Sequence, residues 1–457
     1  MQNNNQTNEM ATGSIPKLFF KLAIPAVVAQ VVNLLYNIVD RIYIGHIPEI
    51  GASALTGVGL FSSIMMFITA FSMLAGAGGA PLASIALGKN DKDHAEKIMT
   101  NSFLLLLIFS VILTILIYIF APTLLTMFGA SEVTLPYAVD YARIYVLGTV
   151  CVLLVTGMNP FVTTQGFAQI AMLTTVIGAV INIVLDPIFI FGLGMGVKGA
   201  ALATILSQGV GAIWILRFLT GNKTLLKLRK ENMKLDPKIF GPTLALGISP
   251  FIMVSTESLL AISFTTSLAK YGGDIAVGAM TIITSINMLV TMPLQGFTQG
   301  GQPIMSYNYG AGNVDRVKKA FFMQFGVCVG YAAFFWGLCM LMPNVLASIF
   351  TTDAALGEYA TWAIRIYMAG IFSVGFQLAC QQSFMALGQA AISLVMAFLR
   401  KLILLIPLIF ILPNFFADKV FGVFVAEPVS DIIAATITTI TFFTQFKKIM
   451  AKTAKAE

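Results

Sequence analysis

Long apolar runs, each bounded by glycine, proline or charged residues, recur along the whole chain. Each run is about 20 residues or longer, the length that an α-helix needs to cross a hydrocarbon core about 30 Å thick. The runs lack the alternating pattern of about 10 residues that is typical of a membrane β-barrel, so they predict helices. Twelve spans are predicted, at about residues 17–45, 53–86, 97–120, 137–158, 163–192, 196–219, 240–270, 276–304, 317–341, 359–386, 389–412 and 419–445.

The composition agrees with this pattern. Of 457 residues, 58% are hydrophobic and only 10% are charged, and the mean hydropathy is +0.88. Soluble folds of this length carry more charge on their surfaces. The chain is therefore predicted to be an all-α integral membrane protein, surrounded by membrane lipid.

Basic residues fall between the predicted spans. The net charge of +7 therefore reflects the rule that cytoplasmic loops are rich in Lys and Arg, and no nucleic-acid partner is expected. With Lys17 and Lys21 on the cytoplasmic side, most of the 27 Lys and Arg residues fall on that side as well. Both termini are predicted to be cytoplasmic.

The longest charged stretch separates two halves that repeat each other. It predicts an N-lobe of residues 1–220, a cytoplasmic linker of residues 221–239 and a C-lobe of residues 240–457. Seven residues recur 222 positions later: Pro81, Gly88, Lys97, Phe128, Arg143, Tyr145 and Gly166 return as Pro303, Gly310, Lys319, Phe350, Arg365, Tyr367 and Gly388. Six spans per repeat bring the chain back to the same membrane face, so two pseudo-symmetric six-helix lobes related as parallel repeats are predicted.

Polar residues inside the N-lobe spans form a candidate site. A carboxylate in a membrane-length apolar helix costs about 2.5–3.5 kcal/mol on insertion scales, and such residues usually face a bundle interior or a wet cavity. Asp186 lies in INIVLDPIFIFG with Asn182 one helical turn before it, while Asp40 and Thr204 lie in spans one and six. Further polar residues share these helix faces at helical spacing, namely Asn33, Asn37 and Gln208.

Four of these residues are expected at the same depth in the membrane. Counted at about 1.5 Å per residue, Asp40, Asn182, Asp186 and Thr204 are expected at one level, in the outer third of the membrane. Carboxylate, amide and hydroxyl oxygens suit a proton or a small hard cation such as Na⁺. The alternative for Asp40 is a helix-end aspartate paired with Arg41.

The acidic group is expected in the N-lobe alone. The repeat places Leu408 at the counterpart of Asp186 and, with a two-residue shift, Phe264 at the counterpart of Asp40. Both counterparts are apolar, so the C-lobe lacks these carboxylates.

The C-lobe carries its own charges within predicted spans. Arg400 in span eleven is expected to form a structural ion pair with Glu427 or Asp431 of span twelve, in preference to a role in transport. Glu257 in span seven has no obvious cation in the sequence. It is left open between a carboxylate that binds substrate and a hydrogen-bonded core residue.

Catalytic constellations are missing from the sequence. His46 and His94 lie without Cys or carboxylate spacing for a metal, and no serine lies in a nucleophile elbow. The chain is therefore not expected to be an enzyme, and no cofactor is expected besides a coupling ion.

Several stretches resemble one known family. They are LAIPAVVAQVVNLLYNIVDRIYIGH, LGKNDKDHAEK with its repeat YGAGNVDRVKK, INIVLDPIFIFGLGMGVKGAALATILSQ and FGVFVAEPVSD. Together they resemble the multidrug and toxic compound extrusion (MATE) transporters, in particular the DinF- and MepA-like bacterial branch. The resemblance covers nearly the whole chain, about residues 15–445.

The resemblance implies a function and a site. It implies a monomer in the cytoplasmic membrane of a bacterium that exports amphipathic, often cationic drugs in exchange for H⁺ or Na⁺. The cation site of the family falls on Asp40, Asn182, Asp186 and Thr204, and its span-seven glutamate falls on Glu257. The group of Arg400, Glu427 and Asp431 also matches the branch.

The predicted mechanism is alternating access of the two lobes. Asp40 and Asp186 would share a dry pocket, and binding of H⁺ or Na⁺ would remove the cost of closing it. A flippase for a lipid-linked precursor is the first alternative, although such a protein favours a more cationic cavity. An intramembrane enzyme or a channel is the second, and the missing catalytic residues and the one-sided ion site argue against it.

Overall fold

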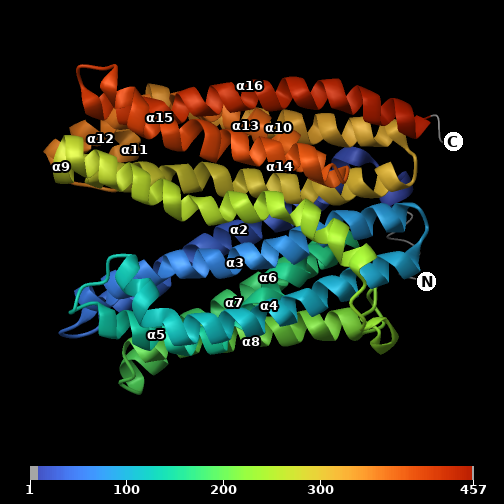
Figure 1. The fold of residues 1–457 in the computed structure, drawn as a ribbon, viewed down its shortest axis with the longest axis horizontal. Coiled ribbons are helices and arrows are strands. Elements are labelled where there is room, and N and C mark those ends of the chain that lie inside the picture. The colour runs from blue at the N-terminus through green and yellow to red at the C-terminus, as the bar shows by residue number, and fades with distance from the viewer. Residues whose placement is uncertain (1–8, 455–457) are drawn as a thin grey trace. The chain divides into compact units, whose positions relative to one another are not determined.

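The computed structural model describes residues 9–454 and is helical within them (Figure 1). Contacts between Cα atoms divide the chain into two compact units: unit 1 contains Val28–Val254, and unit 2 contains Ser14–Val27 and Ser255–Glu457. The predicted lobes ended instead at the charged stretch of residues 221–239. Packing therefore divides the chain at different places from the sequence repeat, because the first parts of spans one and seven pack with the other repeat's helices.

The elements of the first half are α2 (Ile15–Gly45), α3 (Gly51–Gly88), α4 (Lys92–Met127), α5 (Leu135–Leu147), α6 (Thr149–Thr164), α7 (Ala168–Pro187), η1 (Ile188–Gly192), α8 (Val197–Thr220), η2 (Lys230–Asn232) and α9 (Pro237–Gly310). Those of the second half are α10 (Val314–Leu341), α11 (Pro343–Ser348), α12 (Ala354–Tyr367), η3 (Met368–Gly370), α13 (Ile371–Ala386), α14 (Ala390–Phe398), η4 (Leu399–Leu405), α15 (Ile406–Ile411), η5 (Leu412–Asn414) and α16 (Lys419–Ala454).

The membrane spans agree with the predicted pattern. Within the described residues, ten helical segments are long and apolar enough to cross a membrane, and α5 with α6, bent by 59°, makes an eleventh. The 74-residue α9 is broken at Gly273, whose φ of 65° and ψ of −160° suit only glycine. Each side of this break is long enough for one crossing, which gives the twelve spans and the all-α membrane fold predicted from the sequence.

The sequence repeat is also a structural repeat. Gly148 and Gly370, 222 positions apart, both lie at a helix bend where an added Cβ would come within 2.4 Å of Ile205 and 2.7 Å of Pro428, respectively. Gly166 and Gly388 both follow a helix end with positive φ, 87° and 69°. Equivalent backbone geometry at equivalent positions confirms that the chain consists of two similar halves.

Close contacts between small residues hold the helices of unit 1 together, as is usual in membranes. An added Cβ on Gly76 of α3 would lie 2.4 Å from the carbonyl oxygen of Gly157 on α6. On Gly247, in the first part of α9, it would lie 1.9 Å from the carbonyl oxygen of Leu74 on α3. These backbones touch without intervening side chains.

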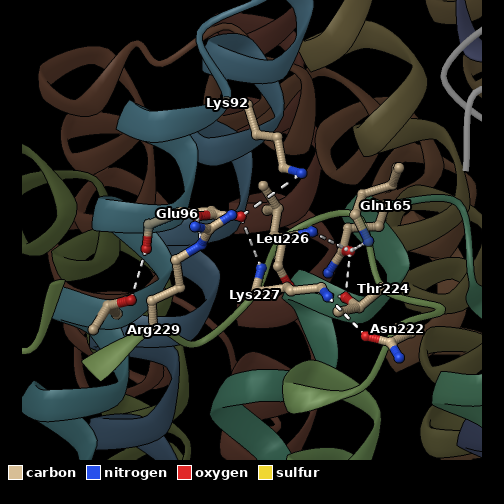
Figure 2. A network of polar contacts seen from close by, with 10 residues as sticks. Lys92, Glu96, Gln165, Asn222, Thr224, Leu226, Lys227 and Arg229 are labelled. Atoms are coloured by element: carbon tan, nitrogen blue, oxygen red, sulfur yellow. Dashed lines mark hydrogen bonds and ion pairs between the residues drawn. The ribbon is translucent and has the colours of Figure 1, made fainter. Parts of the chain in front are cut away.

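Hydrogen bonds and an ion pair hold the charged stretch after α8 against unit 1 (Figure 2). Buried Gln165 accepts hydrogen bonds through Oε1 from Thr224 Oγ1 (2.7 Å) and from the backbone N–H groups of Leu225 (2.7 Å) and Leu226 (2.8 Å). Buried Glu96 pairs with Arg229 Nε at 2.9 Å and accepts from the Lys227 N–H. The predicted linker is therefore packed on one unit over much of its length.

Candidate functional site

Three of the predicted site residues meet where α7 packs against α8. Asp186 is fully buried, and Asn182 and Thr204 are 1% and 6% exposed. Asn182 Nδ2 donates to Asp186 Oδ1 at 3.2 Å and to Thr204 Oγ1 at 3.4 Å. Thr204 can accept this bond because its own hydroxyl donates to the Ala200 carbonyl at 3.0 Å. The i, i+4 spacing of Asn182 and Asp186 thus produces the direct contact that helical geometry predicts.

Asp40 of α2 completes the group from a third helix. Its carboxyl group lies close enough to that of Asp186 for the two to interact electrostatically. The neighbouring Arg41 is exposed, and its guanidinium donates to Ser62 Oγ at 3.4 Å. Asp40 therefore lies with the buried polar group, and the expected alternative pairing with Arg41 is not the contact that the structure gives.

The chemistry of the group is that of an acceptor cluster. Asp40 Oδ1, Asn182 Oδ1 and Asp186 Oδ2 are buried and have no hydrogen-bond donor among the described residues. Leaving one buried acceptor unsatisfied costs about 1–3 kcal/mol, and more where it is charged. A bound proton or a small oxygen-preferring cation would remove this cost. The donor set therefore fits H⁺ or Na⁺.

A softer metal does not suit the residues present. In the described part of the chain, no three His, Cys, Asp or Glu side chains lie close enough together to hold a metal ion. The group offers two carboxylates with an amide and a hydroxyl, and neither thiolate nor imidazole. Ligands of this kind suit hard cations rather than zinc or copper.

Tyrosines that the sequence did not point to surround the carboxylates. Tyr36 on α2 and Tyr141 and Tyr145 on α5 lie within electrostatic range of Asp40, and Tyr141 contacts Thr204. The rings of Tyr141 and Tyr145 stack at 5.9 Å, and Phe61 packs edge-on against both. The available signals were the i, i+4 spacings of Tyr36 with Asp40 and of Tyr141 with Tyr145. They give no hint that α5 lies beside α2.

The remaining polar residues predicted for this site lie outside its core. Asn37 donates through Nδ2 to the Asn33 carbonyl of its own helix at 2.6 Å, and the contact is partly buried. Gln208, one turn beyond Thr204, is half-buried. In the part of the chain that the structure describes, these three amides make no hydrogen bond to the four core residues.

The charges of the second half form a separate group in unit 2. Arg400 pairs with Asp431 at 2.8 Å and with Glu427 at 3.5 Å, so the predicted partners do meet. Glu257, for which the sequence offered no obvious cation, pairs through its carboxylate with the ammonium group of Lys401. These two residues are 144 positions apart. Sequence spacing alone therefore did not reveal the pair.

Two similar helical halves, each with buried carboxylates between its helices, are typical of a multi-pass membrane protein of the transporter class. The family model described as MatE matches residues 25–188 and 250–411, which together are more than half of the chain. The chain therefore belongs to the MatE family, and the resemblance found in the sequence is confirmed.

Curated relatives match almost end to end. Multidrug export protein MepA of Staphylococcus haemolyticus is 25% identical over 430 residues, which cover 93% of both chains. The protein of the same name from Staphylococcus aureus is 24% identical over 433 residues, covering 92% of this chain and 93% of the relative.

Solved structures share the fold. An outward-facing conformation of a multidrug resistance MATE family transporter of the MOP superfamily superposes with a TM-score of 0.90 at 25% identity, over 96% of this chain and 98% of that one. A crystal structure of MATE in the bent conformation gives a TM-score of 0.91 at 24% identity, over 98% and 99%.

Proposed function

We propose that this protein is a multidrug efflux antiporter that exports amphipathic, often cationic compounds in exchange for H⁺ or Na⁺. The observation that carries the proposal is that one buried side-chain oxygen on each of Asp40, Asn182 and Asp186 has no hydrogen-bond donor among the described residues. The proposal is also supported by the curated relatives, which are named as multidrug export proteins. None of these names is that of an enzyme.

The proposed mechanism follows from the chemistry of the acceptor group. Without a bound cation, Asp40 and Asp186 place two carboxylates together among apolar helices, which favours a conformation in which water reaches them. Binding of a proton or Na⁺ neutralises part of this charge and allows the pocket to close dry. Alternating access of two lobes would couple this step to drug movement, because a bound ion shifts an equilibrium only through its different affinity for the two states.

The proposed setting is a bacterial cytoplasmic membrane, with both termini on the cytoplasmic side and the protein acting as a monomer. The asymmetry of Lys and Arg between the predicted loops supports this orientation. Cysteine accessibility at either end of the chain, measured in spheroplasts and inverted vesicles, would test it.

Transport by the purified protein in proteoliposomes tests the function. ΔpH and ΔNa⁺ are imposed separately, and movement of a fluorescent organic cation such as ethidium is followed. We expect one of the two gradients to drive ethidium against its own gradient. Asp40→Asn and Asp186→Asn should each abolish this movement while leaving the yield of folded protein unchanged.

A matched control is available outside the site. Asp140 on α5 is an exposed carboxylate that pairs with Lys198 at 3.4 Å, so Asp140→Asn should transport at close to the wild-type rate. Full activity of Asp40→Asn or Asp186→Asn would overturn the site assignment. Movement of a lipid-linked sugar phosphate, with none of ethidium, would favour the flippase alternative.

A further inference from the structure

The charged group of unit 2 lies between helices that match those of the unit 1 site. Its members come from α9, from η4 after α14, and from α16, and the repeat relates these elements to α2, α7 and α8. The residues are Glu257, Arg400, Lys401, Glu427 and Asp431. Each half of the chain therefore places ionisable groups between its first, fifth and sixth spans, although with different side chains.

The two groups coincide only in part along these helices, because Arg400 is displaced by a turn whereas Glu427 comes close to the level of Thr204. Positions 222 residues before Arg400 and Glu427 are Gly178 and Ile205, one turn before Asn182 and one residue after Thr204. The repeat counterparts of Asn182 and Asp186 in unit 2 are two apolar residues, Leu404 and Leu408. The charges of the unit 2 group therefore do not derive from the same positions of the repeat as the acceptor cluster, and they need their own explanation.

Two consecutive cationic side chains on a π-helical segment pair with different acidic residues. η4 spans Leu399–Leu405, and such widened turns are frequent at functional sites. Arg400 reaches α16, where its Nε and Nη2 both lie 2.8 Å from Asp431 Oδ1. Lys401, with a side chain only 5% exposed, reaches Glu257 on α9 instead.

The charges of this group do not balance. Three carboxylates face two cations, and each cation makes its closest contact with a different acid: Arg400 with Asp431, and Lys401 with Glu257. Among the described residues, the ion pair of Glu427 is longer, from its Oε1 to Arg400 Nη2 at 3.5 Å. One negative charge is therefore in excess, and Glu427 is the acid with the weakest pairing.

The other oxygen of Glu427 is buried and has no hydrogen-bond donor within residues 9–454. The side chain is nine-tenths buried, and Pro428 directly after it packs against the bend at Gly370. The groups that face the carboxyl are Tyr367 of α12, Arg400 and Lys401 of η4, Glu257 of α9 and Asp431 of α16. A charged carboxylate oxygen without a hydrogen-bond donor is strongly disfavoured in such surroundings, and protonation removes the charge.

We propose that Glu427 is a proton-exchange site of unit 2, separate from the acceptor cluster of unit 1. A hydronium ion gives its proton to the carboxylate at Oε2, so one O–H bond of hydronium breaks, an O–H bond forms on Glu427 and a water molecule is left. The side chain becomes neutral while Arg400 stays with Asp431. Release of the proton restores the carboxylate, and Arg400 then shares its charge between Asp431 and Glu427. A metal ion does not suit this position, because the guanidinium group of Arg400 would repel it.

Infrared difference spectroscopy of the full-length protein in lipid tests the proposal without any transport. The background variant carries Asp40→Asn and Asp186→Asn, which remove the unit 1 carboxyls, and its glutamates are labelled with ¹³C so that their C=O stretch differs from that of aspartate. Titration between about pH 5 and about pH 9 should show a protonated glutamate that loses its proton as the pH rises. Glu427→Gln should remove this signal.

A second variant distinguishes charge balance from a structural role. Asp431→Asn leaves two carboxylates for two cations, so Arg400 should pair with Glu427 and the protonated-glutamate band should disappear although Glu427 is still present. Asp315→Asn, which removes an exposed carboxylate on α10, is the control that should leave the band unchanged. If Glu427→Gln fails to fold, the Asp431→Asn result decides alone.

Three outcomes would overturn the proposal. They are a band that persists in Glu427→Gln, a band that persists in Asp431→Asn, and a titration that shifts when Na⁺ is added at constant ionic strength. The last outcome would mean that the group binds Na⁺. Failure of the ethidium assay would leave the infrared result unaffected. The infrared measurement follows Glu427 in a variant that already lacks the Asp40 and Asp186 carboxyls, and it requires no transport.

Discussion

Asn182 donates a hydrogen bond to Asp186 one helical turn later on α7, at 3.2 Å, and the same amide nitrogen also reaches Thr204 Oγ1 on α8. A single side chain thus links a buried carboxylate to the neighbouring helix. Asn182 is the organising donor of the acceptor cluster, which makes it as informative a target for mutation as the carboxylates themselves.

We expect Asn182→Leu to lower gradient-driven ethidium transport at least tenfold, because Asp186 loses its amide donor and its fixed orientation. A tenfold change corresponds to about 1.4 kcal/mol, close to the lower end of the range of about 1.5–3 kcal/mol for one hydrogen bond to a charged group. Initial rates in proteoliposomes would measure it. Wild-type rates in Asn182→Leu, with Asp186→Asn inactive, would show that the amide only fills space.

Substitutions at Thr204 distinguish between H⁺ and Na⁺ as the coupling ion. Thr204→Val removes the hydroxyl oxygen and keeps the shape, whereas Thr204→Ser keeps the oxygen. If Na⁺ is the coupling ion, Thr204→Val should raise the Na⁺ concentration for half-maximal transport several-fold while Thr204→Ser stays near wild type, because a hard cation loses one ligand. Equal Na⁺ dependence in both variants would count against hydroxyl ligation.

Gln165 holds the charged segment after α8 in place, because its Oε1 accepts from three donors of that segment. Gln165→Leu removes the acceptor of the Leu225 and Leu226 N–H groups, at a cost of about 1–3 kcal/mol for each that stays buried, while Thr224 Oγ1 keeps its bond to the Leu226 carbonyl. We expect faster tryptic cleavage within residues 223–230, measured by intact-mass spectrometry. Gln389→Leu, at the equivalent turn of the second half, is the control, and equal cleavage in both variants would contradict the prediction.

Gly247 and Gly241 lie on the same helix and should respond in opposite ways to alanine. A Cβ on Gly247 would lie 1.9 Å from the Leu74 carbonyl oxygen, whereas one on Gly241 meets nothing within 4 Å. Gly247→Ala should therefore lower the thermal unfolding midpoint, with a cost of about 1–3 kcal/mol or more. Gly241→Ala should leave the midpoint unchanged or raise it slightly. A stable Gly247→Ala variant would show that α3 and α9 can move apart at no cost.

Arg400→Met leaves Asp431 and Glu427 in a buried site without their guanidinium partner. Removing one member of a buried ion pair typically costs about 3–5 kcal/mol, so we expect a marked fall in the unfolding midpoint measured in detergent. The double variant Arg400→Met with Asp431→Leu should recover part of this loss, because one of the two unpartnered carboxylates is then gone and Glu427 can become neutral by taking up a proton. A double variant no more stable than Arg400→Met alone would contradict this account.

The parts of this structure that follow local rules were accessible from the sequence. Span lengths predict the helices, and the i, i+4 spacing of Asn182 and Asp186 predicts their contact on one helix face. Counting residues along the helices brought Thr204 and Asp40 to the same level. The repeat also predicted that the acidic group belongs to one half only, since Leu408 stands at the counterpart of Asp186.

The contacts that the sequence did not reveal depend on long-range packing. Tyr141 and Tyr145 lie on α5, which is bent by 59° from α6, and a bend of this kind is not predicted by the hydrophobic pattern. Lys401 meets Glu257 because η4 is a π-helix, and an α-helical projection gives no reason for two consecutive residues both to point inward. Gln165 binds a segment about 60 residues away through backbone donors, which leave no trace in side-chain patterns.

The division of the chain into units bears on how such a fold arises. Residues 14–27 pack with unit 2, and α9 up to Val254 packs with unit 1, so each repeat gives the start of its first helix to the other repeat. A single ancestral repeat would have been incomplete alone and would have obtained this segment from a second copy, as in a domain-swapped dimer. Fusion of the two genes would then have made the exchange intramolecular, after which each copy could acquire a different set of buried charges.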